Sequence, residues 1–215
     1  MNAVLRKLLA KKNVFEPVLL PGPVTVPGLV LMQSHPLWLV ERWAKRYGLE
    51  AAAKICGYDQ AVPSTAIHVG DDSAWGELES EGIELEPGVL VRRARRVTRG
   101  DITKTKPFAD GRIWIQDEGS QFIAMLVGRG ERLLDCCAAP GGKTAILAER
   151  NPQSAILAVE IHEHRARAMQ KRLEGRRNVK VVAADATKVS EANFDRVLAD
   201  VPCSGTGTLA RNPEI

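Results

Sequence analysis

The strongest constraint on the fold is a set of four short apolar runs in the second half of this 215-residue chain. Helical patterns separate the first three runs, and strands that alternate with helices predict βαβ units with a parallel sheet. We therefore expect an α/β fold for this half of the chain. The runs are RLLDCC, AILAVE, VKVVAAD and DRVLADV, at residues 132–137, 155–160, 179–185 and 195–201, and the helical patterns are GKTAILAERN at 142–151 and EHRARAMQKRLEG at 163–175.

An acidic residue lies at or near the end of each predicted strand: Asp135, Glu160, Asp185 and Asp200. The carboxyl ends of parallel strands meet at one edge of a sheet, where open α/β sheets bind ligands. Glu160 follows Gly141 by nineteen residues, a position typical of an acid that binds ribose hydroxyls. Any one of these acids could instead cap a helix or lie in a solvated turn. Together the four acids favour a nucleoside pocket.

The turn after the first predicted strand is rich in glycine and proline. Its sequence, AAPGG at residues 138–142, leads into the helical pattern. Glycines let a ligand approach the backbone N–H groups of a helix N-terminus closely. The phosphate-binding pattern GxxxxGK[ST] would need a glycine at Cys137, and GxGxxG is also absent. The turn therefore favours a nucleoside without a pyrophosphate.

The first half of the chain divides into two predicted parts. Residues 1–34 read as a short basic helix and a proline-rich linker, because the prolines of PVLLPGPVTVPG disfavour a regular helix. Residues 35–115 read as a small α+β subdomain. Its expected helices are HPLWLVERWAKRYG, EAAAKICG and DSAWGELESEG, the last with Asp72 or Ser73 as N-cap, and its expected strands are STAIHV, VLVRR and RIWIQ.

The basic residues of this subdomain are concentrated in one stretch. The whole chain carries a net charge of +4 with a pI of about 9.0, whereas residues 92–106 hold seven basic residues and one acid. Such a run is either a solvated loop or a strip that contacts phosphates, and the second reading predicts RNA binding. The strip consists of Arg92, Arg93, Arg95, Arg96, Arg99, Lys104 and Lys106.

Several other classes of protein are disfavoured. No apolar run approaches the length of about 20 residues that a membrane span needs, so we expect no membrane partner. The four cysteines lack the pattern of a disulfide framework, which favours a reducing, cytoplasmic setting. There is no C-x2-C pair, and His162 and His164 are two positions apart on a predicted helix, so we expect no metal site.

Three segments, in order and spacing, resemble a known family. DCCAAPGGKT, VLADVPCSGTG and RNPEI resemble the S-adenosylmethionine-dependent RNA cytosine-C5 methyltransferases, and most of all the bacterial Sun/RsmB-type enzymes of small-subunit ribosomal RNA. WIQDEGSQ is similar to the lead-in of that family, and MNAVLRKLL to the last helix of its NusB-like RNA-binding domain. The resemblance implies a Rossmann-like class I methyltransferase domain at residues 116–215, with strand order 3-2-1-4, and an RRM-like subdomain that precedes it in the chain. An Arg-x-Asn motif often found near STAIHV in the family is not visible here.

The resemblance also implies roles for the residues at the strand ends. Glu160 would hold the ribose hydroxyls of S-adenosylmethionine, Asp185 would lie by the adenine, and Asp200 would lie near the centre of methyl transfer. The segment that would wrap the methionine and ribose parts consists of Cys137, Ala138, Ala139, Pro140, Gly141, Gly142 and Lys143.

Methylation of cytosine C5 requires activation of a poor nucleophile. A thiolate that adds to C6 makes C5 enamine-like and able to attack a methyl group. Asp200 and Cys203, in the segment DVPC, supply a carboxylate and a thiol at a strand end, although a free cysteine is more often a small packing residue. The resemblance implies that Cys203 helps to release the product and that the nucleophile is a second cysteine on a later strand, beyond residue 215. We therefore expect a fragment with little or no methyl transfer alone.

Two other functions stay open. The chain could be a non-catalytic RNA-binding module that uses the strip at 92–106, or it could belong to an enzyme that methylates transfer RNA. The segment similar to a NusB-like domain favours 16S ribosomal RNA as the partner. The sequence does not identify the modified cytosine.

Overall fold

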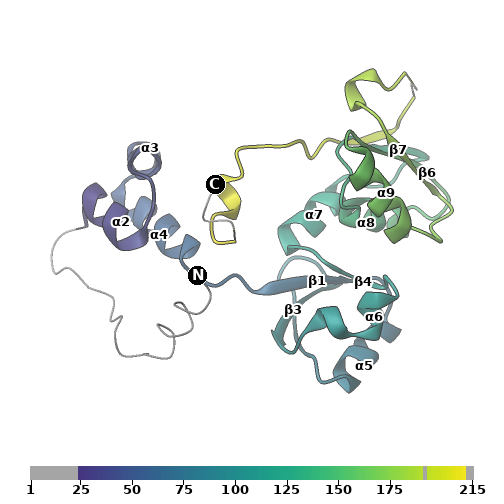
Figure 1. The fold of residues 1–215 in the computed structure, drawn as a ribbon, viewed down its shortest axis with the longest axis horizontal. Coiled ribbons are helices and arrows are strands. Elements are labelled where there is room, and N and C mark those ends of the chain that lie inside the picture. The colour runs from purple at the N-terminus through teal and green to yellow at the C-terminus, as the bar shows by residue number, and fades with distance from the viewer. Residues whose placement is uncertain (1–23, 191–192, 212–215) are drawn as a thin grey trace. The chain divides into compact units, whose positions relative to one another are not determined.

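The structure is a computed structural model that describes residues 24–190 and 193–211 (Figure 1). The helix expected at residues 1–9 and most of the RNPEI segment lie outside the described residues. The chain forms two compact units, one of residues 1–63 with 205–215 and one of residues 64–204. No helix in the described ranges combines the length and apolarity that crossing a membrane requires.

Three helices form the described core of the first unit. Leu29, Val40, Ala52 and Cys56 pack together there, with Cys56 fully buried as a packing residue. The helices are α2 (Val26–Gln33), α3 (Leu37–Tyr47) and α4 (Leu49–Asp59), and a 3-10 turn, η3 (Thr206–Thr208), also belongs to this unit.

The α2 helix corrects the prediction of a linker up to residue 34. Pro27 lies in the first turn of α2, where a helix needs no N–H donor, so this proline begins the helix instead of breaking it. Thr25 caps the helix, and its Oγ1 accepts a hydrogen bond from the N–H of Gly28 at 3.2 Å. The predicted boundary at residue 35 therefore falls inside a packed group of helices, whereas the units divide after residue 63.

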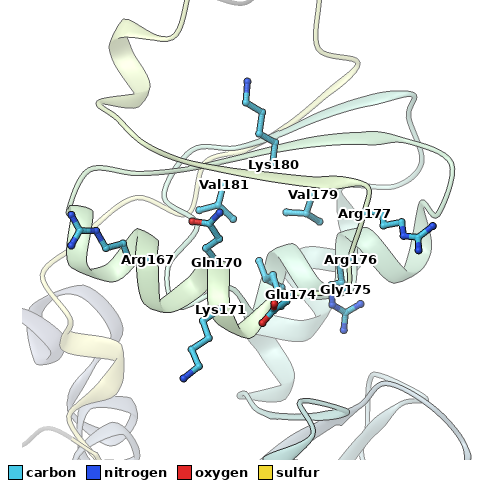
Figure 2. A pocket seen from close by; sticks show the side chains of 11 residues that line it. Arg167, Gln170, Lys171, Glu174, Gly175, Arg176, Arg177, Val179, Lys180 and Val181 are labelled. Carbon is cyan, nitrogen blue, oxygen red and sulfur yellow. The ribbon is translucent and has the colours of Figure 1, made fainter.

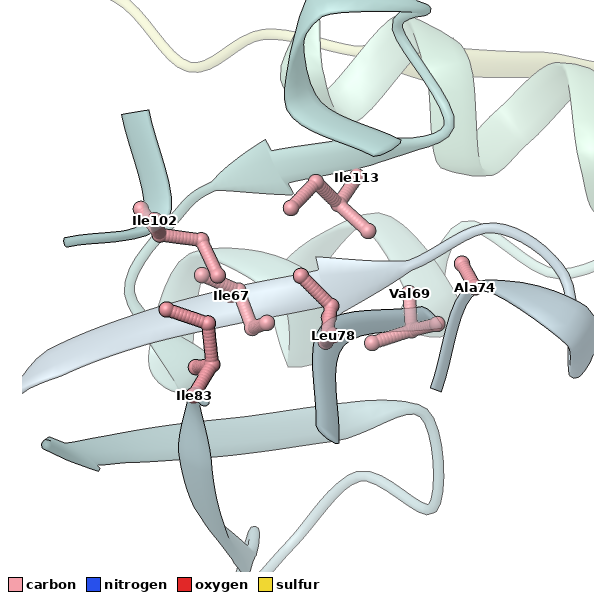
Figure 3. Close-up of a cluster of buried hydrophobic side chains, with 7 residues drawn as sticks. All are labelled: Ile67, Val69, Ala74, Leu78, Ile83, Ile102 and Ile113. Carbon is pink, nitrogen blue, oxygen red and sulfur yellow. The ribbon is translucent and has the colours of Figure 1, made fainter. Parts of the chain in front are cut away.

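An antiparallel sheet opens the second unit, with the strand order β2-β3-β1-β4. Its core lies between the sheet and α5, where Ile67, Val69, Leu78 and Ile113 are almost fully buried (Figure 3). The elements are β1 (Thr65–Val69), α5 (Ser73–Ser80), β2 (Glu84–Pro87), β3 (Ala94–Arg99), η1 (Ile102–Lys104), α6 (Lys106–Ala109) and β4 (Ile113–Ile115).

One strand prediction in this sheet was wrong, whereas the predicted N-cap position of α5 was confirmed at Asp72. The segment VLVRR at 89–93 is a turn, and β3 begins only at Ala94. The carboxylate of Glu118 accepts hydrogen bonds from the N–H groups of Val89, Leu90 and Val91 at 2.6 to 3.1 Å, which replaces a strand partner. The α5 helix is capped by the side chain of Asp71, whose Oδ1 accepts from the N–H of Ala74 at 3.0 Å; Asp72 holds the N-cap position without such a bond.

The second sheet of this unit is parallel and follows the four apolar runs. Its order is β7-β6-β5-β8, which are its third, second, first and fourth strands along the chain, as the order 3-2-1-4 predicts. The elements are α7 (Glu118–Leu126), β5 (Arg132–Asp135), α8 (Gly142–Arg150), β6 (Ala155–Glu160), α9 (Glu163–Arg172), β7 (Val179–Ala183), η2 (Ala186–Lys188) and β8 (Arg196–Leu198).

Alternate residues of the parallel strands pack on opposite faces of the sheet. Leu133 and Ile156 pack against Leu147 of α8. Leu134 and Leu157 pack on the other face, against side chains from residues 182–194. Both faces of the central strands β5 and β6 are therefore buried, as continuous apolar runs predict, whereas β7 and β8 are more exposed. The carboxyl ends of the strands, with their acids, lie together at one edge.

Candidate functional site

A cavity of about 230 Å³ opens at the carboxyl ends of β5 and β8. It brings together most of the turn that the sequence singles out, and it adds residues from β4 and α7. Its predicted lining residues are Cys137, Ala138, Ala139, Pro140, Gly142, Lys143 and Asp200; the others are Trp114, Ile115, Gln116, Asp117, Ser120, Asp135 and Arg172.

Gly141 belongs to the same turn but is not among the residues that line the cavity. Its φ of +102° lies in the region that favours glycine, and a Cβ at this position would lie 3.0 Å from Cγ of Met169. The glycine is thus required by backbone geometry and packing. Gly142 approaches the cavity wall closely, because a Cβ there would lie 2.8 Å from Oε1 of Gln116.

Asp135 is the most deeply buried acid of the site, with 1% of its surface exposed. Its Oδ2 accepts a hydrogen bond from Oγ1 of Thr144 at 2.8 Å. Its Oδ1 is buried and has no hydrogen-bond partner among the described residues. Burial raises the pKa of Asp135 to about 6, although Thr144 and Lys143 act in the opposite direction. A buried carboxylate oxygen without a donor is costly, so the site suits a ligand that brings a donor.

Lys143 and Asp200 form an ion pair across the cavity. Nζ of Lys143, in the first turn of α8, lies 2.6 Å from Oδ2 of Asp200, two residues after the end of β8. The lysine also favours the charged form of Asp135, while Asp200 disfavours it. One cation therefore lies between two of the acids that the sequence places at neighbouring strand ends.

Glu160 is buried but does not line the cavity. Its Oε1 accepts from the N–H of His162 at 2.9 Å, and its Oε2 lies 3.6 Å from Nη1 of Arg165. One oxygen of this carboxylate therefore holds the turn into α9. The other oxygen has a cation nearby at more than ordinary hydrogen-bond distance.

Asp185 is also outside the cavity lining. It caps η2, since its Oδ1 accepts from the N–H and Oγ1 of Thr187 at 2.9 and 2.7 Å. These hydrogen bonds lower its pKa below the ordinary value. Asp185 therefore has the capping role that was considered for a single strand-end acid, and its Oδ2 lies 3.8 Å from Nζ of Lys188.

Cys203 differs from the other described cysteines by being exposed. Burial raises the pKa of the Cys136 and Cys137 thiols, and the neighbouring Asp135 adds to this effect. Cys56 is buried in the helical unit, where burial again raises its pKa. A reactive thiolate needs an accessible thiol with a pKa that is not raised, which makes Cys136, Cys137 and Cys56 poor candidates.

The basic strip at 92–106 is largely neutralised within the chain. Arg96 pairs with Glu86, and Arg99 Nη1 lies 3.1 Å from Oε1 of Glu84 on the neighbouring strand. Arg95 lies over the ring of Trp75 at 3.9 Å. The remaining partners are Asp72, Val69 O and Gly70 O for Arg93, Asp101 for Lys104 and Asp110 for Lys106, whereas Arg92 has none for its side chain among the described residues. RNA binding by this strip stays a prediction.

Sequence reasoning did not assign roles to Trp114, Gln116 and Arg172. Trp114 is 2% exposed, and the guanidinium of Arg172 lies over its ring at 4.5 Å. Oε1 of Gln116 is buried without a partner among the described residues. The sequence pointed to this part of the site only through the similarity of WIQDEGSQ to the lead-in of the family. The described residues contain no cluster of three or more His, Cys, Asp or Glu side chains that could hold a metal.

A buried polar network ties β1, α7 and α8 together within the second unit. His68 contacts Oε1 of Gln121 through Nδ1 at 3.1 Å and Oε2 of Glu149 through Nε2 at 2.7 Å. Arg176 donates to Oε1 of Glu149 at 2.9 Å. Burial raises the pKa of Glu149, but the bonds and charges of His68 and Arg176 outweigh this and hold it below the ordinary value. The network thereby connects α8 to β1 and to the turn after α9.

Part of the chain is similar to known ribosomal RNA methyltransferases. Residues 123–215 match the family described as 16S rRNA methyltransferase RsmB/F. A probable ribosomal RNA small subunit methyltransferase B of Bacillus subtilis is 36% identical over 85% of this chain and 44% of its own length. A ribosomal RNA small subunit methyltransferase B of Serratia proteamaculans is 33% identical over 84% of this chain and 45% of its own length. The chain thus spans less than half of these curated relatives.

A solved structure supports the fold. It is described as a methyltransferase homolog protein from Pyrococcus horikoshii and superposes with a TM-score of 0.77 at 26% sequence identity. The superposition covers 86% of this chain and 65% of that protein.

Proposed function

Residues 123–215 belong to the RsmB/F family of 16S rRNA methyltransferases, and we propose that this chain binds S-adenosylmethionine for C5 methylation of a cytosine in 16S ribosomal RNA. The observation that carries the proposal is the unpartnered, buried Oδ1 of Asp135, beside the Lys143–Asp200 ion pair. The names of the two curated relatives favour small-subunit ribosomal RNA over transfer RNA as the substrate.

The carboxylate acceptors of the site fit the chemistry of this cofactor. S-adenosylmethionine carries an ammonium and a sulfonium but no pyrophosphate, and the strand ends supply four acids with no phosphate-binding loop. We assign the ammonium to Oδ1 of Asp135, the ribose hydroxyls to Glu160 and the adenine side to Asp185. The backbone of residues 137–143 would enclose the methionine and ribose parts, because glycine and the first turn of α8 allow close approach.

The bound cofactor would supply a methyl group on a sulfonium. Asp200 would accept a hydrogen bond from the N4 amino group of the cytosine, with Lys143 holding the carboxylate in place. This contact would fix the orientation of the base at the cavity. Cys203 would assist release of the methylated base, since its thiol is exposed in the loop after β8. Single-stranded presentation or flipping would be needed to bring the base to this edge of the sheet.

Calorimetric titration with S-adenosylmethionine tests the assignment. We expect saturable binding by the wild-type chain and a 10- to 100-fold (order-of-magnitude) weaker affinity for Glu160→Gln, since hydrogen bonds to a charged group contribute about 1.5–3 kcal/mol. The amide oxygen of the substituted side chain would still accept from the N–H of His162, so the fold should persist. Glu163→Gln is the matched control, because Glu163 is exposed and its only ion pair with a described residue is with Arg167. Equal affinities for wild type and Glu160→Gln would contradict the ribose assignment.

A further inference from the structure

A second strongly basic surface lies between α9 and the edge strand β7. Residues 163–180 hold seven basic residues and two acids. A hollow of about 640 Å³ is formed there (Figure 2). We call this surface the α9–β7 patch; it is lined by Arg167, Gln170, Lys171, Leu173, Glu174, Gly175, Arg176, Arg177, Val179, Lys180 and Val181.

The local sequence explains how the patch forms. Arg167, Lys171 and Glu174 are spaced by four and three residues, so they lie on one side of α9 and of the turn that follows. Gly175, with a φ of +90°, reverses the chain after the helix. Lys180 is then exposed on β7, which has only one neighbouring strand, β6, among the described residues.

Three cations of the patch are not neutralised within the chain. Lys171, Arg177 and Lys180 are exposed, and their side chains form no hydrogen bond or ion pair with the residues that the structure describes. Arg167 and Arg176, by contrast, pair with Glu163 and Glu149. The strip at 92–106 has the opposite character, because intramolecular partners engage six of its seven cations. Among the described residues, the patch therefore holds more cations without a side-chain partner than the strip does.

The arrangement of the side chains indicates the form of the partner. Figure 2 shows Lys180 and Lys171 on opposite sides of the hollow and Arg167 and Arg177 at its two ends. Cations spread in this way do not converge on one phosphate ion, but they suit successive phosphates of an extended chain. Val179 and Val181, both half-buried, form an apolar floor that could contact ribose or base faces.

We propose that the α9–β7 patch binds the phosphate backbone of single-stranded RNA, apart from the residues that line the cofactor cavity. The proposal rests on the proposed function for its choice of RNA as the polyanion. None of the patch residues lines the cavity, so the two surfaces can be tested separately. The patch would hold RNA that extends beyond the target base, and its contribution would be electrostatic and independent of sequence.

The test compares two triple variants of the full chain that remove equal charge. One carries Lys171→Gln, Arg177→Gln and Lys180→Gln; the other carries Arg96→Gln, Arg99→Gln and Lys104→Gln in the strip. Fluorescence anisotropy with a labelled single-stranded RNA oligonucleotide of mixed sequence gives Kd at several salt concentrations. Titration with S-adenosylmethionine then reports whether the cofactor site is intact.

We expect the patch variant to bind RNA about 10- to 100-fold more weakly than the wild type. The slope of the logarithm of the binding constant against the logarithm of the salt concentration should become shallower by about 2, because each of the three lost phosphate contacts contributes about 0.7. The strip variant should lose less, and cofactor affinity should stay unchanged in the patch variant. An equal or greater loss in the strip variant, or polyglutamate binding to the patch as tightly as RNA, would overturn the proposal. If the wild type binds RNA and the patch variant binds it with equal affinity, this inference is refuted and the proposed function is not. A wild type that binds no RNA even at low salt refutes the proposed substrate as well.

Discussion

Replacement of Asp135 by Asn should stabilise the cofactor-free chain while removing a cofactor contact. Asp135 is 1% exposed, and its pKa is raised by burial to about 6 from an ordinary value of 3.8. The native chain therefore holds this proton more tightly than the unfolded chain does. Above pH 6 the buried carboxylate must be charged in the folded state, which costs stability. Asn cannot ionise, and its oxygen can still accept from Thr144.

The size of the effect follows from the shift in pKa. A rise of about two pKa units corresponds to about 3 kcal/mol, at about 1.4 kcal/mol per unit. Because the native pKa is raised, no cost is present below the unfolded pKa of 3.8. The cost grows as the pH rises from 3.8 to 6 and is then complete. The stability of Asp135→Asn relative to wild type should therefore increase by about 3 kcal/mol between about pH 4 and about pH 7.

Urea denaturation of both proteins at a series of pH values measures this difference. Asp195→Asn provides a control of opposite sign, because backbone N–H groups of Arg132 and Glu131 lower the pKa of Asp195. That variant should be less stable than wild type at neutral pH, and the deficit should shrink as the pH falls through the lowered pKa. A pH-independent difference for Asp135→Asn would refute the reasoning, as would a loss of stability at neutral pH.

Two further substitutions test the scaffold of the site by urea denaturation. Gly141→Ala should lower the free energy of unfolding by about 1–3 kcal/mol, since φ at this position is +102° and the added Cβ would meet Met169. Gly76→Ala is the control, because Gly76 lies in a helix with open space around it, and this change should leave stability unchanged or raise it. Equal effects of the two substitutions would contradict this role for Gly141. Glu149→Gln should cost about 2–3 kcal/mol near neutral pH through weaker bonds to His68 and Arg176. Because the pKa of Glu149 is lowered, that cost should shrink as the pH falls below its ordinary 4.5, and a cost that is constant down to acid pH would argue against the network.

The sequence predicted the parallel sheet well because its signals are local. Apolar runs such as AILAVE carry the information for a strand buried on both faces, and β6 occupies the same residues, Ala155–Glu160. The acids after the strands were likewise readable, and the ion pair of Asp200 with Lys143 follows from their common edge. Local composition gave wrong predictions in two places: Pro27 begins α2 instead of breaking it, and a distant partner changes the conformation of residues 89–91. Glu118 holds residues 89–91 in a turn, although their sequence is typical of a strand.

The functional details depended on contacts between distant residues. Gly141 was interpreted as a site of ligand approach, whereas its Cβ position faces Met169, which is 28 residues later in the sequence. The charge of the strip at 92–106 suggested a free basic surface, but carboxylates such as Glu84 and Glu86 on β2 neutralise much of it. The basic stretch of α9, by contrast, leaves Lys171 without a side-chain partner among the described residues. Pairing across strands and turns, and not composition, decides which cations are available.

Selective cofactor binding is the most direct test of the central claim, that the edge formed by β5, β6 and β8 holds a nucleoside without a pyrophosphate. Calorimetry on the wild-type chain would compare S-adenosylmethionine, S-adenosylhomocysteine and NAD. The account predicts saturable binding of the first two compounds and no binding of NAD. The turn at 138–142 lacks the pattern of a phosphate-binding loop, and Oδ1 of Asp135 has no hydrogen-bond donor among the described residues. Binding of NAD as tight as that of S-adenosylmethionine, or no binding of either S-adenosyl compound by the folded chain, would contradict it.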